Sequence, residues 1–334
     1  MKTELLIPEQ IISMLKAPGQ ANDTDLEISS DALRCTQTGN SYEFVDGVPS
    51  LLASTREATG DIGTRVHAFY EENPFPNYES IDDFGDLVSK GYSSSFSNEL
   101  LREIGSNKCI LECGCGTGQL SHFLQLNNNH VLGIDMSLNS LKLAIEFKLN
   151  NHLVRSGFAQ MDLFSLAVKD ESMDVVISHG VLHHTPDARR AFHEIIKKVK
   201  PGGIVVVGLY NAIARVPTWL RAKAMPLLGP NIDYIARTRI MDERKREIWT
   251  KDQYFNPHET WHSIDEVMNW FSEENVEYLN CRPSIYDTDG EGDAGMFDKT
   301  SPGTRYQRVV TQLSWLNSIA REGAVFDVIG RKRE

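Results

Sequence analysis

The chain has 334 residues, 41% of them hydrophobic and 24% charged, a composition typical of a folded protein with a sizeable core. It contains no run of 18 apolar residues, which excludes a membrane-spanning helix, and its first 15 residues lack the pattern of a signal peptide. We therefore expect a cytoplasmic protein. The net charge of −12 disfavours a nucleic-acid partner, because binding a polyanion needs clustered lysine and arginine. The chain has five cysteines, Cys35, Cys109, Cys113, Cys115 and Cys281. Because their number is odd and their spacing irregular, they do not indicate a disulfide framework.

The chain divides into five segments. Residues 1–55 form a small separate module that ends in a short apolar strand at 48–52, and residues 56–107 are a polar, partly helical approach. Within the approach, prolines on both sides of Phe75 predict an extended, aromatic loop over 69–78. From 108 to 210, short apolar strands alternate with helices. The expected strands are 109–113, 131–134, 158–161, 173–178 and 204–209, and the expected helices are 119–126, one with Ser137 as N-cap, and 187–199. This order predicts a doubly wound α/β fold with a parallel sheet.

An insertion rich in Arg, Trp, Tyr and His follows the fifth strand over residues 211–262. Regular structure resumes in 263–334, with helices expected at 264–271 and 306–321 and strands at 277–281 and 324–329.

Three alternate glycines, Gly114, Gly116 and Gly118, stand between the first strand and its helix. Glycine lets the backbone turn tightly and approach a ligand, and in a doubly wound sheet this loop lies where ligands bind. A dinucleotide site would have its third glycine at position 119, where this chain has Gln119. Glu112, just before the loop, would repel a pyrophosphate and attract an ammonium. This charge pattern favours S-adenosylmethionine, which carries an ammonium and a sulfonium and no phosphate.

Two further carboxylates follow the next two strands. Asp135 is placed to accept hydrogen bonds from ribose hydroxyls, and Asp162 from the exocyclic amine of adenine. Met136 and Leu163 are expected to sandwich the adenine ring. A single acidic residue after a strand is usually a surface charge or a helix cap. Three at the carboxyl ends of successive strands indicate one binding site.

These segments resemble the class I S-adenosylmethionine-dependent methyltransferases. The resemblance covers 105–210 and 264–330 and is carried by the sequences ILECGCGTG at 110–118, LGIDMS at 132–137, MDVVIS at 173–178, VLHHTPD at 181–187 and VKPGG at 199–203. It implies a Rossmann-like, mostly parallel seven-stranded sheet whose final strand runs antiparallel. It also implies that His179 or Gly180 meets the methionine end of the cofactor through the backbone.

The N-terminal module resembles a degenerate zinc ribbon of the kind that accompanies or activates several methyltransferases. Residues 16–20 stand where that module has a Cys-Pro-x-Cys knuckle, and only Cys35 remains as a ligand. A structural zinc site needs four ligands, so we expect no metal. The module is either a partner-docking or substrate-shaping domain, or a cap that stabilises the sheet.

Candidate acceptor residues come from three places. Histidine is the side chain best suited to proton transfer near neutral pH, and the candidates for that catalytic role are His183, His184, His258 and His262. Tyr254 and Trp261 make 254–262 the leading substrate segment, although it is equally typical of an ordered surface loop. A second wall is expected from Tyr70, Phe75, Asn77 and Tyr78, and polar contacts from Tyr210, Asn211 and Arg215. The alternative for His183 and His184 is a packed element that caps a loop.

The favoured function is methylation of a small-molecule acceptor, because the chain is acidic and the insertion is large and aromatic. The alternatives are a methyltransferase acting on RNA or protein, and a non-catalytic methyltransferase-like subunit. Residues 217–228 are amphipathic and basic, which suits a lid, a homodimer contact or a peripheral membrane contact.

Overall fold

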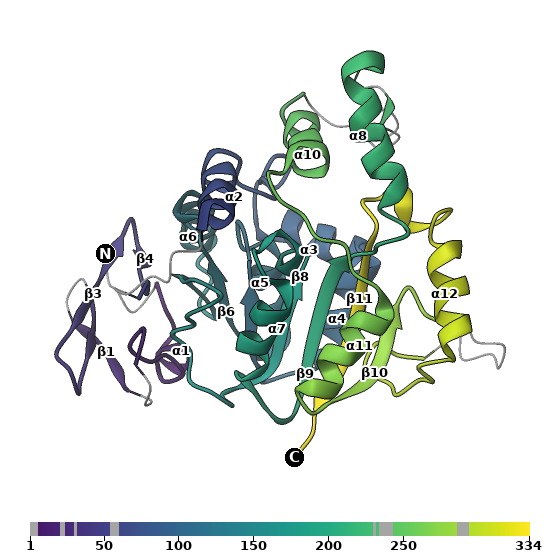
Figure 1. The fold of residues 1–334 in the computed structure, drawn as a ribbon. Helices are drawn as coiled ribbons and strands as arrows, with labels where there is room; N and C mark the ends of the chain where they lie inside the picture. Colours follow the sequence, from purple (N-terminus) through teal and green to yellow (C-terminus); the bar gives the residue numbers. More distant parts are fainter. Residues whose placement is uncertain are drawn as a thin grey trace.

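The computed structural model describes residues 6–20, 24–29, 32–53, 60–229, 232–233, 243–285 and 294–334. Its centre is a sheet of seven strands: β5 (Cys109–Cys113), β6 (His130–Asp135), β7 (Ser156–Gln160), β8 (Met173–His179), β9 (Val199–Tyr210), β10 (Val276–Arg282) and β11 (Val325–Lys332). Their spatial order is β10-β11-β9-β8-β5-β6-β7 (Figure 1). Strands β5 to β9 pair in parallel, whereas β11 is antiparallel to both its neighbours. The predicted fold class, including the reversed final strand, is therefore confirmed.

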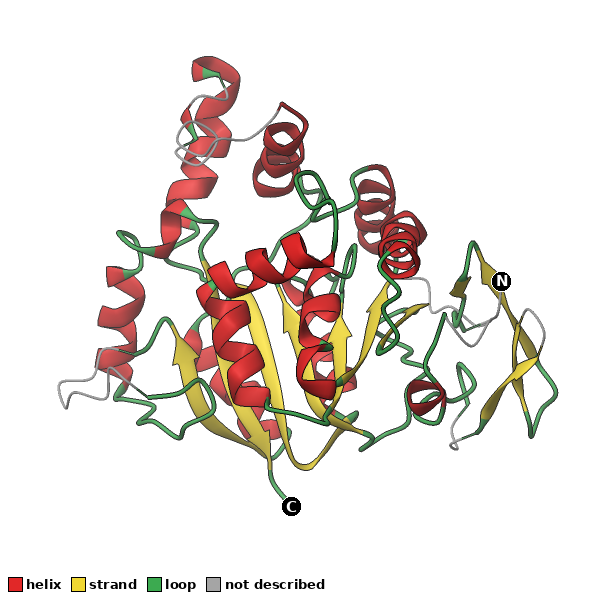
Figure 2. Ribbon diagram, turned by 180° about the vertical axis from the view of Figure 1, so that it is seen from behind, coloured by secondary structure: helices red, strands yellow, loops and turns green. Residues whose placement is uncertain are grey.

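The strands are apolar on both faces because helices cover both (Figure 2). Leu111 and Val176 pack with α7 (Ala188–Ile196) and α11 (Ile264–Glu273) on one face. Ile110 and Ile177 pack on the other, against α3 (Phe84–Ser93), α4 (Ser95–Ile104) and α5 (Gln119–Leu124). Since successive residues of a strand point to opposite sides, each strand contributes to both cores.

Side-chain caps mark where several helices begin. Ser137 accepts from the Ser140 amide and opens α6 (Leu138–Asn150), as the sequence predicted. Asp187 and Ser263 do the same for α7 and α11. Thr304 forms a capping box at the start of α12 (Arg305–Ser314).

Several boundaries differ from the prediction. Helix α7 ends at Ile196, and β9 already begins at Val199. Helix α12 ends at Ser314, and only a 3-10 turn, η5 (Ile319–Arg321), follows it. Helix α2 (Gly60–Glu72) includes 69–72, which we expected to be extended. A proline disfavours helix at its own position and at the residue before it, so Pro74 ends α2 at Glu72 without affecting earlier residues.

The N-terminal module consists of α1 (Glu9–Ile12) and an antiparallel sheet of β1 (Leu26–Ser29), β2 (Ala32–Cys35), β3 (Ser41–Val45) and β4 (Val48–Pro49). It lies beside the β7 edge of the main sheet, where the Leu51 amide donates to the Gln160 carbonyl over 2.9 Å. The Sγ of Cys35 accepts from the Thr38 amide. Within the described ranges, no group of three or more His, Cys, Asp or Glu is arranged to hold a metal.

The insertion contributes α8 (Val216–Leu228) and α10 (Glu243–Phe255), which stand above the carboxyl ends of the parallel strands (Figure 1). Helix α8 projects outward, and its last residues, Leu227 and Leu228, are 88% and 69% exposed. Among the helices that the structure describes, none is long and apolar enough to cross a membrane.

Candidate active site

The glycine loop is shaped by its own neighbours in the fold. Gly114, Gly116 and Gly118 all have positive φ angles, of 75°, 53° and 77°. A Cβ at Gly116 would collide with the Phe75 carbonyl oxygen, and one at Gly118 would lie 2.5 Å from the Phe158 ring. Sequence reasoning attributed these glycines to the approach of a ligand. The structure adds that the chain itself leaves no room for a side chain at these positions.

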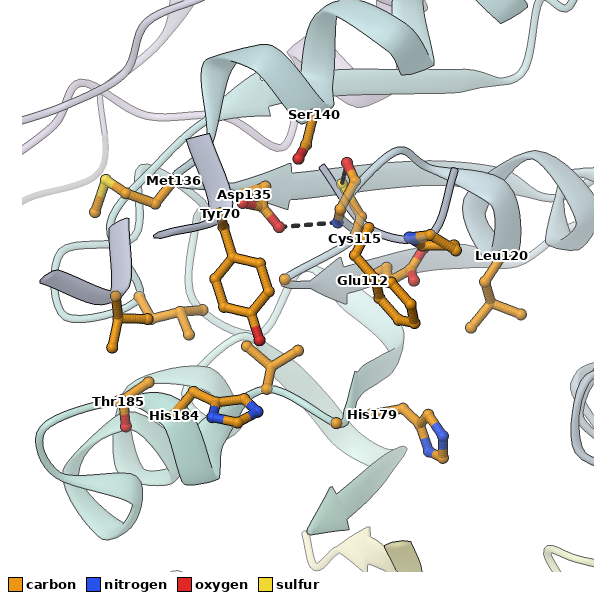
Figure 3. A pocket seen from close by; sticks show the side chains of 18 of the residues that line it. Tyr70, Glu112, Cys115, Leu120, Asp135, Met136, Ser140, His179, His184 and Thr185 are labelled. Carbon is orange, nitrogen blue, oxygen red and sulfur yellow. Dashed lines mark hydrogen bonds between the residues drawn. The ribbon is translucent and has the colours of Figure 1, made fainter. Parts of the chain in front are cut away.

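Three expected carboxylates converge on one cavity of about 540 Å³ at the carboxyl ends of β5, β6 and β7 (Figure 3). Glu112 ends near the glycine loop, Asp135 is the last residue of β6, and Asp162 follows β7. The two oxygens of Asp135 accept hydrogen bonds of 2.8 Å from the amides of Gly116 and Ser137. These bonds fix the carboxylate in place while it lines the cavity.

Glu112 is a buried acid. Burial, with a smaller contribution from the charge of Asp135, raises the pKa of Glu112 to about 7. The hydrogen bond that Ser121 donates to Oε2 and the nearby His179 act in the opposite direction and lower it. A cation beside Glu112 would favour its charged form. The residue therefore suits an ammonium group better than any uncharged ligand.

The expected adenine residues also lie on the cavity wall. Met136 and Leu163 line it, together with Met161 and Phe164. Asp162 is 6% exposed, and its Oδ1 accepts from the Phe164 amide over 2.9 Å. Apolar side chains beside one oriented carboxylate suit a flat ring that carries an amine.

Helices and aromatic rings form a further part of the cavity wall, which we call the chamber. It is lined by Tyr70 of α2, Phe75 and Tyr210 at the end of β9, three of the residues that we expected to contact the acceptor. Trp249 and Gln253 of α10 close the wall. The insertion therefore contributes to this chamber through α10, whereas no residue of α8 is among the described lining residues.

His184 is one of three histidines that line the cavity, with His67 and His179. Its Nδ1 lies 2.8 Å from the His258 carbonyl oxygen, which can only accept a hydrogen bond. The neutral ring therefore carries its proton on Nδ1 and presents Nε2 as the basic nitrogen. The ring centroid of His184 lies 6.1 Å from that of Tyr70 and 5.5 Å from that of Tyr210.

Three of the four candidate histidines, His183, His258 and His262, lie outside the described cavity wall. His183 is fully buried with its ring 3.8 Å from that of Tyr210, and burial, with nearby positive groups, holds its pKa well below the usual range. His262 is 5% exposed and its Nε2 lies 2.7 Å from the Thr260 hydroxyl. The contact of His258 with His184 is made by its backbone carbonyl, which accepts the hydrogen bond from His184 Nδ1. The segment we expected to touch the acceptor supports the loop that does line the chamber.

Several other residues that we expected to contact the methyl acceptor instead lie outside the described lining and contact neighbouring residues. Arg215 is completely buried, pairs with Glu259 over 2.6 Å and covers the Tyr210 ring at 3.7 Å. Tyr254 donates to Asp233 and Trp261 to Glu259.

Three remaining candidates face away from the cavity as well. Asn211 is buried and bonds to Gln312, and Tyr78 donates to the Thr117 carbonyl. Asn77, whose carbonyl accepts from Gln119, is likewise absent from the described lining. Of the second wall, Tyr70 and Phe75 therefore face the cavity, while Asn77 and Tyr78 do not.

Sequence reasoning included Tyr70 but missed the other cavity-facing residues of α2 and those of α10. Gly63, Val66, His67 and Tyr70 all line the cavity at helical spacing, and Trp249 and Gln253 are four residues apart. Residues three and four apart share a helix face. The spacing was present in the sequence, but it becomes informative only once both segments are known to be helices beside the glycine loop.

Comparison with known proteins agrees with this geometry. Residues 111–207 match a family model described as a methyltransferase domain. The chain is 36% identical over 112 residues to the ubiquinone biosynthesis O-methyltransferase of Hydrogenovibrio crunogenus, covering 31% of this chain and 44% of that protein. It is 26% identical over 249 residues to an uncharacterised protein of Synechococcus, and this match covers 64% of this chain and 58% of that protein. The chain thus spans about half the length of these curated relatives.

A solved structure of Haemonchus contortus phosphoethanolamine N-methyltransferase 2, with 13% identity and a TM-score of 0.47, aligns with 80% of this chain and 60% of that one. The family match covers the glycine loop and the strands that carry Glu112 and Asp135. Together with the strand order and the three carboxylates at the cavity, it identifies residues 111–207 as a methyltransferase domain.

Proposed function

We propose that the protein transfers the methyl group of S-adenosylmethionine to a small-molecule acceptor. The observation that carries the proposal is that one cavity contains both the cofactor carboxylates and the helix-walled chamber of Tyr70, Tyr210 and Trp249. An acceptor in that chamber would share an enclosed space with the cofactor. Alignment of the two reactants is the main contribution that methyl transfer requires of an enzyme.

The side chains of the cavity fit this cofactor. Glu112 would receive the ammonium, Asp135 the ribose hydroxyls and Asp162 the adenine amine. The cofactor supplies an electrophilic methyl group on a sulfonium. The described lining residues include no lysine or arginine that could pair with a pyrophosphate.

The same charge balance supports an uncharged or cationic acceptor. The described lining includes four carboxylic acids, of Glu112, Asp135, Asp162 and Glu322. A phosphate group brought into this cavity would meet these negative charges and lose its hydration without a lysine or arginine to pair with. The wall of α2 and α10 also favours a small acceptor over RNA or a folded protein.

We infer that His184 removes the proton when the acceptor atom carries one. Its Nδ1 proton is held by the His258 carbonyl, so Nε2 is the nitrogen that can accept. His184 lines the chamber, whereas His183, His258 and His262 reach it only through contacts with their neighbours. His183 remains a packed ring beneath Tyr210.

The acceptor class is tested with methyl-labelled S-adenosylmethionine and three separate fractions of the source cells: small molecules, total RNA and total protein. We expect label in the small-molecule fraction. The label should be lost in an Asp135→Ala variant, which removes the carboxylate proposed to accept hydrogen bonds from the ribose of the cofactor. Label confined to RNA or protein would replace the small-molecule proposal. No label in any fraction, with the cofactor bound, would favour a non-catalytic subunit.

The role of His184 is tested once an acceptor is known. His184→Asn should lower turnover by about 10²- to 10⁴-fold while cofactor affinity stays within about twofold. His193→Asn is the matched control, because His193 is on the exposed side of α7 and pairs with Glu274. A His184→Asn variant with the parental rate would exclude proton transfer by this residue.

A further inference from the structure

A histidine and a carboxylate meet across an intervening strand at the edge of the cavity. His179, the last residue of β8, and Asp327 of β11 are both register partners of Gly208 on β9. Nδ1 of His179 lies 2.7 Å from Oδ1 of Asp327. A Cβ at Gly208 would lie 2.5 Å from each of these two atoms. Only glycine at this position of β9 leaves room for the pair.

The pair is held rigidly. Asp327 is 5% exposed, and the His179 ring stacks on Phe96 of α4 with 4.3 Å between ring centroids and 27° between ring planes. The His179 side chain keeps 35% of its surface exposed and lines the cavity. Figure 3 shows it on the side of Glu112 and Leu120, away from Tyr70 and His184. It therefore belongs to the cofactor end of the cavity.

The charges around His179 favour its protonated form. Burial alone lowers the pKa of His179, but the charge and hydrogen bond of Asp327, with a contribution from Glu112, outweigh burial and raise it. The charged or titratable groups that act on the ring are Asp327 on β11, Glu112 on β5 and His183 after β8. Helix α4 contributes Phe96 and Ser97, which carry no charge. With Nδ1 committed to Asp327, the second proton of the imidazolium is on Nε2.

An α-amino acid carries an ammonium and a carboxylate on one carbon. We propose that Glu112 and the His179–Asp327 pair together bind the amino-acid end of the cofactor, Glu112 taking the ammonium and His179 donating from Nε2 to the carboxylate. The inference rests on S-adenosylmethionine as the cofactor, and it gives the His179 side chain a role beyond the backbone contact that the family resemblance implies. His179 supplies the positive charge that lysine or arginine would otherwise provide; the described lining has neither.

The test compares two ligands by titration calorimetry. S-adenosylhomocysteine has the amino-acid end, whereas 5′-methylthioadenosine has the same nucleoside and thioether without it. His179→Gln should weaken binding of S-adenosylhomocysteine about 10- to 100-fold, as expected for loss of a hydrogen bond between charged groups. Binding of 5′-methylthioadenosine should stay within about twofold, and His193→Gln should change neither.

The other outcomes are separable. Unchanged affinity for S-adenosylhomocysteine, with or without a loss of turnover, would overturn the proposal. An equal loss for both ligands would do the same, because it would show a structural role for His179. A parent protein that binds neither ligand would refute the cofactor itself, which is a failure of the proposed function rather than of this site.

Asp327→Asn is the second variant, and it keeps the size of the side chain. Without the Asp327 charge, His179 should lose its proton at lower pH, so that S-adenosylhomocysteine affinity falls at lower pH than in the parent. The two-ligand comparison should again single out the ligand with the carboxylate. Identical pH profiles for parent and variant would contradict the assigned role of the pair.

Discussion

Burying a carboxylic acid without a cation costs stability, and Glu112 is such an acid. It is 7% exposed, and the structure provides a hydroxyl from Ser121 rather than a basic partner at hydrogen-bond distance. The cost is understandable if the ammonium of the cofactor completes the site. Glu112 is therefore a residue whose burial is explained by binding and not by folding.

This residue predicts how stability depends on pH. Because burial raises the pKa of Glu112 from 4.5 to about 7, folding favours the protonated acid. That contribution is complete below pH 4.5 and is lost as the pH rises through about 7. Glu112→Gln should thus be more stable than the cofactor-free parent at pH 8, by on the order of 3 kcal/mol at most. The difference should shrink by pH 5.

Urea unfolding of both proteins at pH 5 and pH 8 measures this directly. A difference between variant and parent that is the same at the two pH values would show that Glu112 is not the titrating group.

A second residue-scale prediction concerns Gly116. Gly116→Ala adds a Cβ that collides with the Phe75 carbonyl oxygen, in addition to the strain of a positive φ. Gly202→Ala is the matched control, since Gly202 has a φ of 75° and open space around its Cβ position. We expect the control to lose about 1 kcal/mol of unfolding free energy and Gly116→Ala to lose about 1–3 kcal/mol more. Equal losses would mean that the Phe75 loop moves aside freely.

At the scale of elements, the side chain of Glu71 links helix α2 to the start of helix α6. The carboxylate of Glu71 accepts from the amides of Leu138 and Asn139 at the start of α6, over 2.6 and 3.1 Å. A carboxylate at a helix N-terminus satisfies amides that have no partner within the helix and interacts favourably with the helix dipole. Tyr70, the next residue along α2, lines the acceptor chamber. The position of one chamber wall thus depends on a contact between two helices.

Glu71→Ala should release α2 while leaving the sheet intact. We expect faster hydrogen exchange over Gly60–Glu72 and a loss of about 1 kcal/mol in unfolding free energy, with Glu72→Ala as the control. The exchange of β5 and β6 amides should not change. Unaltered protection of α2 would show that its other contacts hold it without Glu71.

At the scale of the whole molecule, the N-terminal module shares a core with the sheet. Leu15, Leu33 and Leu51 are fully buried and belong to the same apolar cluster as Leu132 of β6. The buried Nζ of Lys148 donates to the carbonyls of both Leu6 and Ser156, joining the module to β7. These contacts support the cap interpretation of the module over a freely attached docking domain.

Removal of residues 1–53 should therefore impair folding. It would expose the β7 edge and the apolar side chains that now face the module, and both changes promote aggregation. We expect the truncated protein to be insoluble or to lose its cooperative thermal transition. A soluble truncation that unfolds cooperatively and binds cofactor like the parent would instead identify the module as a separate domain.

The sequence by itself determined the sheet and the cofactor carboxylates. Strand–helix alternation is local, and a carboxylate that ends a parallel strand is carried to the same edge as its neighbours, so Glu112, Asp135 and Asp162 could be grouped before their positions were known.

Only the tertiary structure decided the acceptor end. Tyr70 and Trp249 are far apart in the sequence, and helix packing brings them to one wall. The same packing turns His258 and His262 behind that wall and leaves His184 within it. His179 and Asp327 meet because two strands align on either side of Gly208. Such pairings depend on strand register and on which helix faces are buried, and both are set by contacts between residues distant in the sequence.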